Sequence, residues 1–216
     1  MRGRERIMAC YALVGASDFN ADHFQDLDSQ GMFDYVIAVD GGYAHLEAIN
    51  RKPDMALGDF DSLGYVPKNL RVAKFSSKKD KSDMELALDR AKSRRCDEIY
   101  VYGALGGRLD HTLANLQLFA RFCEQGMYVN VVGTSELVMF VTGPDLVELP
   151  ARDGGIVSVF SMSDASLGVF ERGLAYELDD AKLTNRTSLG LSNEFIGEPA
   201  VVGVESGTLA IMVAIP

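Results

Sequence analysis

Two aspartates stand two residues apart, directly after a short apolar run. Residues 55–57 are apolar, Gly58 follows, and Asp59 and Asp61 then flank Phe60. In extended chain, residues i and i+2 lie on one side of the backbone, so both carboxylates face the same way. Two carboxylates this close repel each other unless a cation lies between them, and a hard cation with oxygen ligands suits them. The spacing therefore predicts a Mg²⁺ site that uses one or two carboxylates together with waters and phosphate oxygens.

A second acidic turn follows another apolar run. Residues 35–39 lead directly into Asp40, Gly41 and Gly42. Because the carboxyl ends of parallel strands form the ligand crevice of an open sheet, Asp40 is expected to converge with the pair at 59 and 61. Asp and Gly at strand ends are also ordinary turn residues, so either motif alone is consistent with a simple turn. The two motifs together favour a shared acidic crevice.

A charged segment, residues 78–83, precedes a helical pattern. It holds three lysines, including Lys81, and it also contains Asp80, Ser82 and Asp83. Such runs are commonly solvated loops. Alternatively, the helix N-terminus and the lysines hold a phosphate while Asp80 or Asp83 reaches a metal ion or a ribose. The sequence leaves both readings open.

A glycine-rich stretch, residues 103–111, follows a further apolar run. Arg108 offers a fork of donors suited to phosphate, and Asp110 is placed to begin a helix. His111 could act as a base, although a histidine near a helix start is more often a structural hydrogen bonder. The sequence has no G-x-x-x-x-G-K-[ST] motif, so a nucleotide would be held by something other than a P-loop.

The elements that would position these residues indicate an α/β fold. Up to about Thr142, short apolar runs alternate with helical patterns, as in a mainly parallel sheet covered by helices. Ser82 and Glu85 form a capping-box pattern that predicts a helix from about Ser82. Asp110 is expected to be the N-cap of a helix that ends at Gly126. The predicted strands of this part are Met8–Val14, Tyr35–Val39, Met55–Leu57, Ile99–Tyr102 and Tyr128–Val132.

From residue 143 the pattern changes to short β-branched runs punctuated by Gly, Asp and Asn, which is typical of an all-β domain. We therefore expect an N-terminal α/β sandwich domain at 1–142 and a smaller all-β sandwich domain at 143–216. A domain of this size buries a small core and is expected to lean on a partner surface. Its predicted strands are Ile156–Phe160, Leu174–Leu178, Ala200–Val204 and Thr208–Val213.

Composition limits the partners. The formal net charge of −10 opposes binding to a phosphate backbone, so no nucleic-acid partner is expected. No apolar run reaches the ~18–20 residues that span a bilayer, so no membrane partner is expected. The basic segment 1–6 and the apolar run 7–16 could form a signal peptide, but the run reads equally well as a first buried strand. Three cysteines without C-x-x-C spacing indicate neither disulfides nor zinc, and reduced thiols favour a cytoplasmic location.

Taken together, the motifs resemble thiamine pyrophosphokinase. A further segment, residues 190–195, is similar to that family's G-T-S-N-E-F element in its β domain, with Leu191 where the family usually has Thr. The chain has no Trp, so an aromatic platform for the thiamine pyrimidine would be Phe, Tyr or absent. The motifs that carry the resemblance, in chain order, are 40–42, 58–62, 80–85, 106–111 and 190–195.

The resemblance implies a Mg²⁺-dependent transferase of the kinase type that moves pyrophosphate from ATP to the hydroxyl of thiamine, giving thiamine diphosphate and AMP. It also implies a nucleotide-binding catalytic α/β domain, a thiamine-binding β sandwich, and a homodimer with active sites in clefts between subunits. The implied residues are Asp59, Asp61 and Asp83 for metal and catalysis, Arg108 and Asp110 for catalysis, Asp110, Ser192 and Asn193 for thiamine, and Asp40, Gly41, Gly42, Asp80, Lys81 and Ser82 for the nucleotide.

Two other functions stay open on the sequence. One is a different Mg²⁺-dependent nucleotide phosphotransferase or hydrolase that uses the same acidic crevice with another acceptor. The other is a non-enzymatic sensor of thiamine diphosphate or nucleotide, which would be expected to lack some of the acids, whereas all five motifs are filled. The products separate the two enzymes, because AMP marks pyrophosphoryl transfer and ADP or phosphate marks the alternative.

Overall fold

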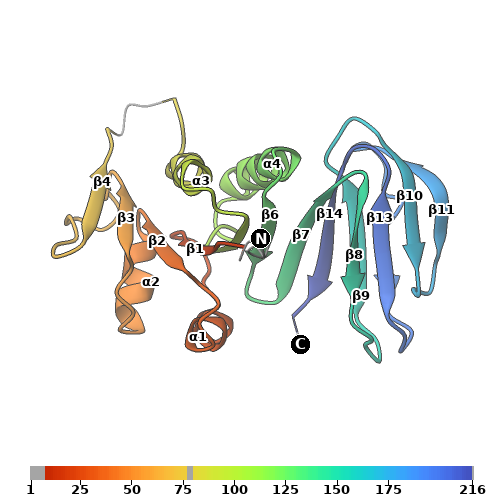
Figure 1. Ribbon diagram of the computed structural model, residues 1–216, viewed down its shortest axis with the longest axis horizontal. Coiled ribbons are helices and arrows are strands. Elements are labelled where there is room, and N and C mark those ends of the chain that lie inside the picture. The colour runs from red at the N-terminus through yellow and green to blue at the C-terminus, as the bar shows by residue number, and fades with distance from the viewer. Residues whose placement is uncertain (1–7, 77–79, 216) are drawn as a thin grey trace, which may run out of the picture. The chain divides into compact units, whose positions relative to one another are not determined.

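The computed structural model describes residues 8–76 and 80–215 of the chain. The basic segment 1–6 and two of the lysines before the predicted helix, Lys78 and Lys79, lie outside the described residues. Internal contacts divide the chain into two compact units, Met1–Thr112 and Leu113–Pro216, whose elements are labelled in Figure 1. The predicted domain boundary after Thr142 stays a prediction.

The first unit contains a parallel sheet. Its strands run in the order β5-β1-β2-β3-β4, and each neighbouring pair is parallel. The strands step in one direction from β1 to β3, and the chain returns from β4 to β5. Right-handed crossovers therefore place α3 on the face opposite α1 and α2. The elements are β1 (Cys10–Val14), α1 (Ala21–Ser29), β2 (Tyr35–Val39), α2 (Gly42–Ala48), β3 (Met55–Gly58), β4 (Arg71–Lys74), α3 (Asp83–Ser93) and β5 (Glu98–Tyr102).

Helices on both faces explain why these strands read as continuous apolar runs. All five residues of β1 are buried. The exposed fraction is 1% or less for Leu13, Ile37, Leu57 and Ile99. The mainly parallel α/β arrangement predicted from the sequence is confirmed.

Three aspartates close the amino ends of the strands. Asp34, Asp54 and Asp97 each stand one residue before a strand, namely β2, β3 and β5. Their Oδ2 atoms accept hydrogen bonds from Cys10 N at 2.9 Å, Val36 N at 2.9 Å and Ala9 N at 3.0 Å, respectively. Because an unpaired backbone N–H is costly when water is excluded, acids at this edge of the sheet stabilise the fold.

Two helices test the capping predictions. Ser82 Oγ accepts a hydrogen bond from Glu85 N at 3.2 Å, so α3 begins as predicted. Helix α4 (Leu109–Glu124) begins one residue before Asp110, so the prediction of Asp110 as its N-cap is wrong, and this carboxylate lies in the first helical turn instead. The helix buries residues from Phe119 onward, whereas Leu113, nearer its start, is 56% exposed.

The second unit is a sandwich of two antiparallel sheets. One sheet has the order β12-β9-β14-β7-β6 and the other the order β11-β10-β13-β8. Buried residues of both sheets, such as Val159, Ile211, Val169 and Val202, form one core, which confirms the predicted sandwich. The strands are β6 (Tyr128–Val132), β7 (Glu136–Thr142), β8 (Asp145–Leu149), β9 (Ile156–Ser161), β10 (Ser166–Arg172), β11 (Leu178–Leu183), β12 (Asn193–Glu194), β13 (Ala200–Val204) and β14 (Thr208–Ala214).

One predicted strand of this unit is wrong. Of the segment expected at Leu174–Leu178, residues 174–177 form the bend between β10 and β11, where Leu174 makes an isolated bridge to Phe195, and Leu178 begins β11. Gly173, at φ 71°, turns the chain out of β10 at this point. No helix among the described residues is long and apolar enough to cross a bilayer.

Candidate active site

The structure brings Asp40 and the acidic loop at 58–62 into direct contact at the carboxyl ends of β2 and β3. Asp40 Oδ1 accepts a hydrogen bond from Phe60 N at 3.0 Å, and Asp40 Oδ2 accepts one from Ser62 Oγ at 2.8 Å. Both carboxylate oxygens of Asp40 therefore hold the loop that carries Asp59 and Asp61.

The backbone of this loop is held in sparsely populated conformations. Asp40 has φ 47° and Phe60 has φ 62°, both in the left-handed region that side chains other than glycine rarely adopt. A Cβ at Gly58 would lie 2.9 Å from Asp40 Cα, so only glycine fits there. Phe60 is 2% exposed, and its buried ring anchors a turn that leaves Asp59 half-buried and Asp61 exposed on either side. Such over-determined strain is common at functional sites.

The donor set of Asp59 and Asp61 fits a hard divalent cation. Asp59 Oδ1 accepts a hydrogen bond from Asp61 N at 3.2 Å, which keeps the two acids together. No lysine or arginine in the described ranges forms an ion pair with either of them. Among those residues there is also no group of three or more His, Cys, Asp or Glu side chains that could form a closed metal cage. An open pair of carboxylates is what Mg²⁺ uses when phosphate oxygens supply the other ligands.

The first turn of α3 lies near the carboxyl ends of the strands, as these acids do. A Cβ at Gly15, which follows β1, would lie 3.1 Å from Met84 Cε, so α3 starts close to the carboxyl end of β1. Asp83 is the first residue of this helix and is half-buried. The helix also contacts β2 and β3, the strands that lead into Asp40 and Asp59. Asp83 is thereby placed at the acidic edge of the sheet.

The residues just before α3 differ in their exposure and in their hydrogen-bond partners. Asp80 is exposed, and Ser82 caps the helix. Lys81 Nζ lies 2.6 Å from Asp89 Oδ2 and 3.5 Å from Glu85 Oε1, and the hydrogen bond that Lys81 donates to Asp89 raises the pKa of Lys81. Lys81 is charged, but α3 itself supplies its partners here.

The two glycines after Asp40 allow close backbone packing. Gly41 precedes α2 and Gly42 is its first residue. A Cβ on Gly42 would collide with the carbonyl oxygen of Val14, and one on Gly41 would lie 2.9 Å from Ser62 Oγ. The absence of side chains therefore lets the start of α2 approach the end of β1 and the acidic loop.

Arg108, in the loop that follows β5, forms an exposed ion pair with Asp110 in the first turn of α4. Arg108 Nε donates to Asp110 Oδ1 at 3.1 Å, and the terminal nitrogen Nη2 donates to Asp110 Oδ2 at 2.6 Å. The hydrogen bond from Arg108 lowers the pKa of Asp110, and the backbone N–H of His111 contributes in the same direction. Asp110 thus occupies the Nε and Nη2 edge of the guanidinium, and the rest of this exposed, planar cation is of the kind that recognises phosphate.

The sequence analysis missed Asp18 at this edge. Asp18 is exposed in the loop after β1, and its carboxylate lies against Gly106, where an added Cβ would collide with it. The signal was available, since Asp18 stands three residues after Gly15 at the end of an apolar run, and Asp59 likewise comes soon after an apolar run that ends in a glycine, Gly58.

In the second unit, a hollow of about 320 Å³ contains Ser192 and Asn193. We call it the β-unit pocket. Its aromatic member is Tyr176, which is 69% exposed. The pocket is lined by Glu171, Tyr176, Leu178, Ser188, Leu189, Gly190, Leu191, Ser192 and Asn193.

Asn193 is 4% exposed, and all four hydrogen-bonding positions of its side-chain amide are used within the protein. Its Oδ1 accepts from Tyr176 N and Glu194 N, both at 2.9 Å. Its Nδ2 donates to Glu171 Oε2 and to Tyr176 O, both at 2.7 Å. An amide can make four such bonds, so Asn193 shapes the pocket wall rather than offering a spare hydrogen bond to it. Ser192, at φ 59°, is exposed, and its hydroxyl has no partner in the described part of the chain.

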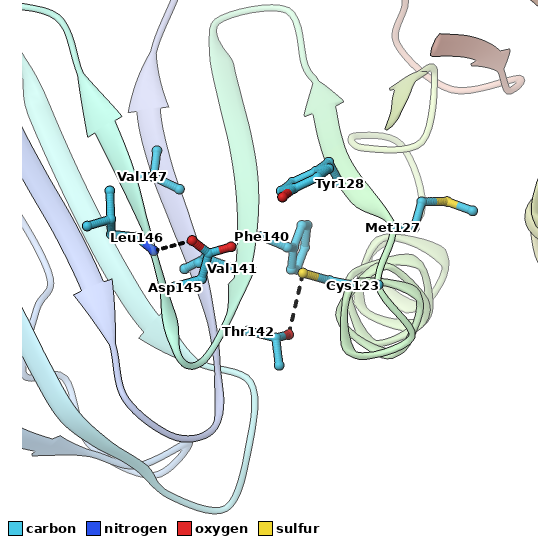
Figure 2. Close-up of a pocket in the computed structure, with 10 residues that line it drawn as sticks. Cys123, Met127, Tyr128, Phe140, Val141, Thr142, Asp145, Leu146 and Val147 are labelled. Carbon is cyan, nitrogen blue, oxygen red and sulfur yellow. Dashed lines mark hydrogen bonds between the residues drawn. The ribbon is translucent and has the colours of Figure 1, made fainter. Parts of the chain in front are cut away.

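A separate hollow of about 360 Å³ in the same unit contains none of the predicted site residues. On its wall, Thr142 Oγ1 donates to Cys123 Sγ at 3.4 Å, and Leu146 N donates to Asp145 Oδ1 at 2.8 Å. Figure 2 marks both hydrogen bonds with dashed lines. Its remaining lining is mostly apolar, including Phe140 and Val147.

Comparison with known families decides between the functions left open. The model described as "Thiamin pyrophosphokinase, catalytic domain" matches residues 31–131, and "Thiamin pyrophosphokinase, vitamin B1 binding domain" matches residues 146–209. The chain belongs to the thiamin pyrophosphokinase family. The family resemblance, the enzyme class and the function predicted from the sequence are confirmed, and neither alternative is favoured.

Individual relatives agree with the family assignment. Thiamine pyrophosphokinase of Bacillus subtilis (strain 168) is 28% identical over 184 residues, covering 82% of this chain and 85% of the relative. Thiamin pyrophosphokinase 1 of Caenorhabditis elegans is 27% identical over 178 residues, covering 74% and 71%.

Solved structures of the family share the fold. Thiamine pyrophosphokinase from Bacillus subtilis superposes with a TM-score of 0.78 at 23% identity, covering 95% of this chain and 98% of the other. The Geobacillus thermodenitrificans structure gives a TM-score of 0.79 at 24% identity, covering 96% and 98%. The acids from Asp40 to Asp110 lie in the segment matched by the catalytic model, and Ser192 and Asn193 lie in the segment matched by the vitamin B1 binding model.

Proposed function

We propose that the chain moves the pyrophosphoryl group of ATP to the hydroxyl of thiamine in a Mg²⁺-dependent reaction, giving thiamine diphosphate and AMP. The observation that supports a Mg²⁺-dependent transfer is the pair Asp59 and Asp61. Asp40 fixes the loop that carries this pair at the carboxyl edge of the sheet. This edge is where open α/β sheets bind their ligands.

Asp59, Asp61 and Asp83 are the residues proposed to hold the metal. When bound there, Mg²⁺ would neutralise charge on the phosphate oxygens of ATP. Asp40 keeps the acidic loop in place through its two hydrogen bonds, so it acts on the nucleotide site by positioning. Gly41, Gly42, Asp80, Lys81 and Ser82 complete the proposed nucleotide side.

Arg108 is proposed to bind the phosphates, since a guanidinium held by one carboxylate still has donors to offer. Asp110 orients that guanidinium and lies near the thiamine hydroxyl. Pyrophosphoryl transfer depends mainly on positioning and on charge stabilisation, and both are supplied by groups fixed before the substrates arrive.

The β-unit pocket is the proposed thiamine site. Tyr176 offers its ring, the Ser192 hydroxyl offers a hydrogen bond, and Asn193 holds the backbone of Tyr176. This assignment is supported by the vitamin B1 binding model, whose matched segment contains all three residues.

We further propose a two-fold homodimer in which the acids of one subunit act with Ser192 and Asn193 of the other, as the family resemblance implies. A cytoplasmic location is proposed as well. It is supported by Cys10, Cys96 and Cys123, which are buried and unpaired with one another, and burial raises the pKa of Cys10 and Cys96 to about 12.

The deciding experiment incubates the full chain with Mg²⁺, ATP and thiamine and resolves the nucleotides. AMP and thiamine diphosphate in equal amounts support the proposal. ADP or phosphate would instead indicate another phosphotransferase or a hydrolase, and thiamine binding without turnover would indicate a sensor.

A further inference from the structure

A glutamate is buried against the β-unit pocket. Glu171, on β10, has an exposed fraction of 0% and is one of the residues that line this pocket. Its Oε2 accepts a hydrogen bond from Asn193 Nδ2 at 2.7 Å. Its Oε1 is buried and has no hydrogen-bond partner in the described part of the chain. Buried carboxyl oxygens are normally paired, so an unpaired one calls for an explanation.

The fold does not provide a counter-charge for Glu171. The adjacent Arg172 pairs with Asp179 at 2.7 Å instead, and no lysine or arginine in the described ranges forms an ion pair with Glu171. Burial raises the pKa of Glu171, and the hydrogen bond from Asn193 opposes this only in part. A buried carboxyl with one open oxygen costs stability and contributes no ion pair in return.

Asn193 and the backbone N–H of Ser192 cannot fill the open position. All four hydrogen-bonding positions of Asn193 are taken by Glu171, Tyr176 and Glu194. Ser192 N is engaged by Ser158 Oγ at 3.1 Å. Glu171 Oε1 is therefore a hydrogen-bond acceptor of this pocket wall that these groups leave without a donor. A carboxylate oxygen accepts hydrogen bonds from N–H donors.

We infer that Glu171 is a specificity-determining residue of the β-unit pocket, whose Oε1 accepts a hydrogen bond from the amino group on the pyrimidine ring of thiamine. The inference rests on the proposed function and names the substrate group that the pocket recognises, the pyrimidine amino group. A site built around a buried acceptor rejects an analogue that lacks the matching donor, because the acceptor is then left unpaired.

The test compares thiamine with oxythiamine, in which a carbonyl oxygen replaces the amino group. Binding of each to the full chain is measured by calorimetry at neutral pH without ATP. Wild type should bind thiamine at least about tenfold more tightly than oxythiamine, because oxythiamine sets an acceptor against an acceptor. Equal affinities in wild type would overturn the inference without any variant.

Glu171→Gln gives the second arm. The amide can keep its oxygen toward Asn193 Nδ2, which leaves its NH₂ group facing the position of Oε1. The ratio of the two affinities should then fall by about tenfold or more. Glu148→Gln is the matched control, because Glu148 is exposed on β8 of the same unit and should leave the ratio at the wild-type value.

The readout separates recognition from structural support. If Glu171→Gln weakened both ligands by the same factor, the ratio would stay constant, the residue would only support the pocket, and the inference would be overturned. If wild type made no thiamine diphosphate but kept the Glu171-dependent preference, the proposed function would fail and the inference would stand. If it made thiamine diphosphate while the ratio ignored Glu171, the inference alone would fail.

Discussion

Replacing Asp59 by Asn removes one negative charge from the proposed metal site and should change the free energy of unfolding very little. Its carboxylate accepts the hydrogen bond from Asp61 N at 3.2 Å, and an amide oxygen can accept that bond equally well. The expected loss of stability is therefore below about 1 kcal/mol, which shifts the Tm by only about 2–4 °C in a chain of this size.

The expected effect on the reaction is much larger. Losing a group that stabilises the transition state lowers turnover by about 100-fold or more, which corresponds to roughly 2.7 kcal/mol of activation free energy. Turnover is measured from AMP and thiamine diphosphate, and Tm from thermal unfolding of the same preparations. Asp61→Asn should behave in the same way, because Asp61 is exposed and belongs to the same pair.

Asp54→Asn is the matched control. It is the same chemical change in the same unit, but Asp54 lies at the amino edge of the sheet and accepts a hydrogen bond from Val36 N at 2.9 Å. Its amide oxygen can accept the Val36 N–H bond as well, so the change should shift Tm little and leave the turnover of folded protein close to wild type. A folded, fully active Asp59→Asn protein would refute the reasoning, as would equal losses of turnover at both edges.

Three further outcomes are expected. Excess chelator should abolish turnover and added Mg²⁺ should restore it, whereas turnover that survives chelation would remove the metal from the proposal. Random subunit exchange between Asp59→Asn and Tyr176→Ala chains should return about one quarter of wild-type activity above the parental background, and free exchange without recovery would exclude a shared site. Burial raises the pKa of folded Glu171 above its unfolded value, so its contribution to stability is complete at low pH and declines as pH rises through the raised pKa. The Tm of Glu171→Gln relative to wild type should thus climb as the pH rises above the ordinary glutamate pKa of about 4.3, and a difference independent of pH would contradict this.

Strand positions followed from the sequence where apolar runs end in turn residues. The strands Tyr35–Val39 and Ala200–Val204 have the predicted bounds, because each run is buried along its whole length or nearly so. Leu174–Leu178 failed because its apolar residues straddle a bend, and only the backbone of Gly173 reveals where β10 ends.

Side-chain partners explain the remaining differences. Asp54 and Asp59 both stand beside β3, and the sequence could separate them only by whether they precede or follow the strand. Asn193 was expected to touch thiamine, but its bonds to Tyr176 and Glu171 depend on residues 17 and 22 positions away. The sequence around Glu171 looks like an ordinary alternating strand, so its burial and its open oxygen could not be predicted.

The clamp on Tyr176 has a consequence for the thermodynamics of binding. One amide side chain ties both the N–H and the C=O of Tyr176, as a neighbouring strand would, although this residue lies in a bend between strands. Its backbone therefore loses its freedom when the protein folds and has little left to lose when a ligand arrives. Loop ordering on association usually costs affinity, and preorganisation reduces that cost. An exposed aromatic ring on a rigid backbone can therefore bind a flat heterocycle with a smaller entropic penalty than a ring on a loose loop.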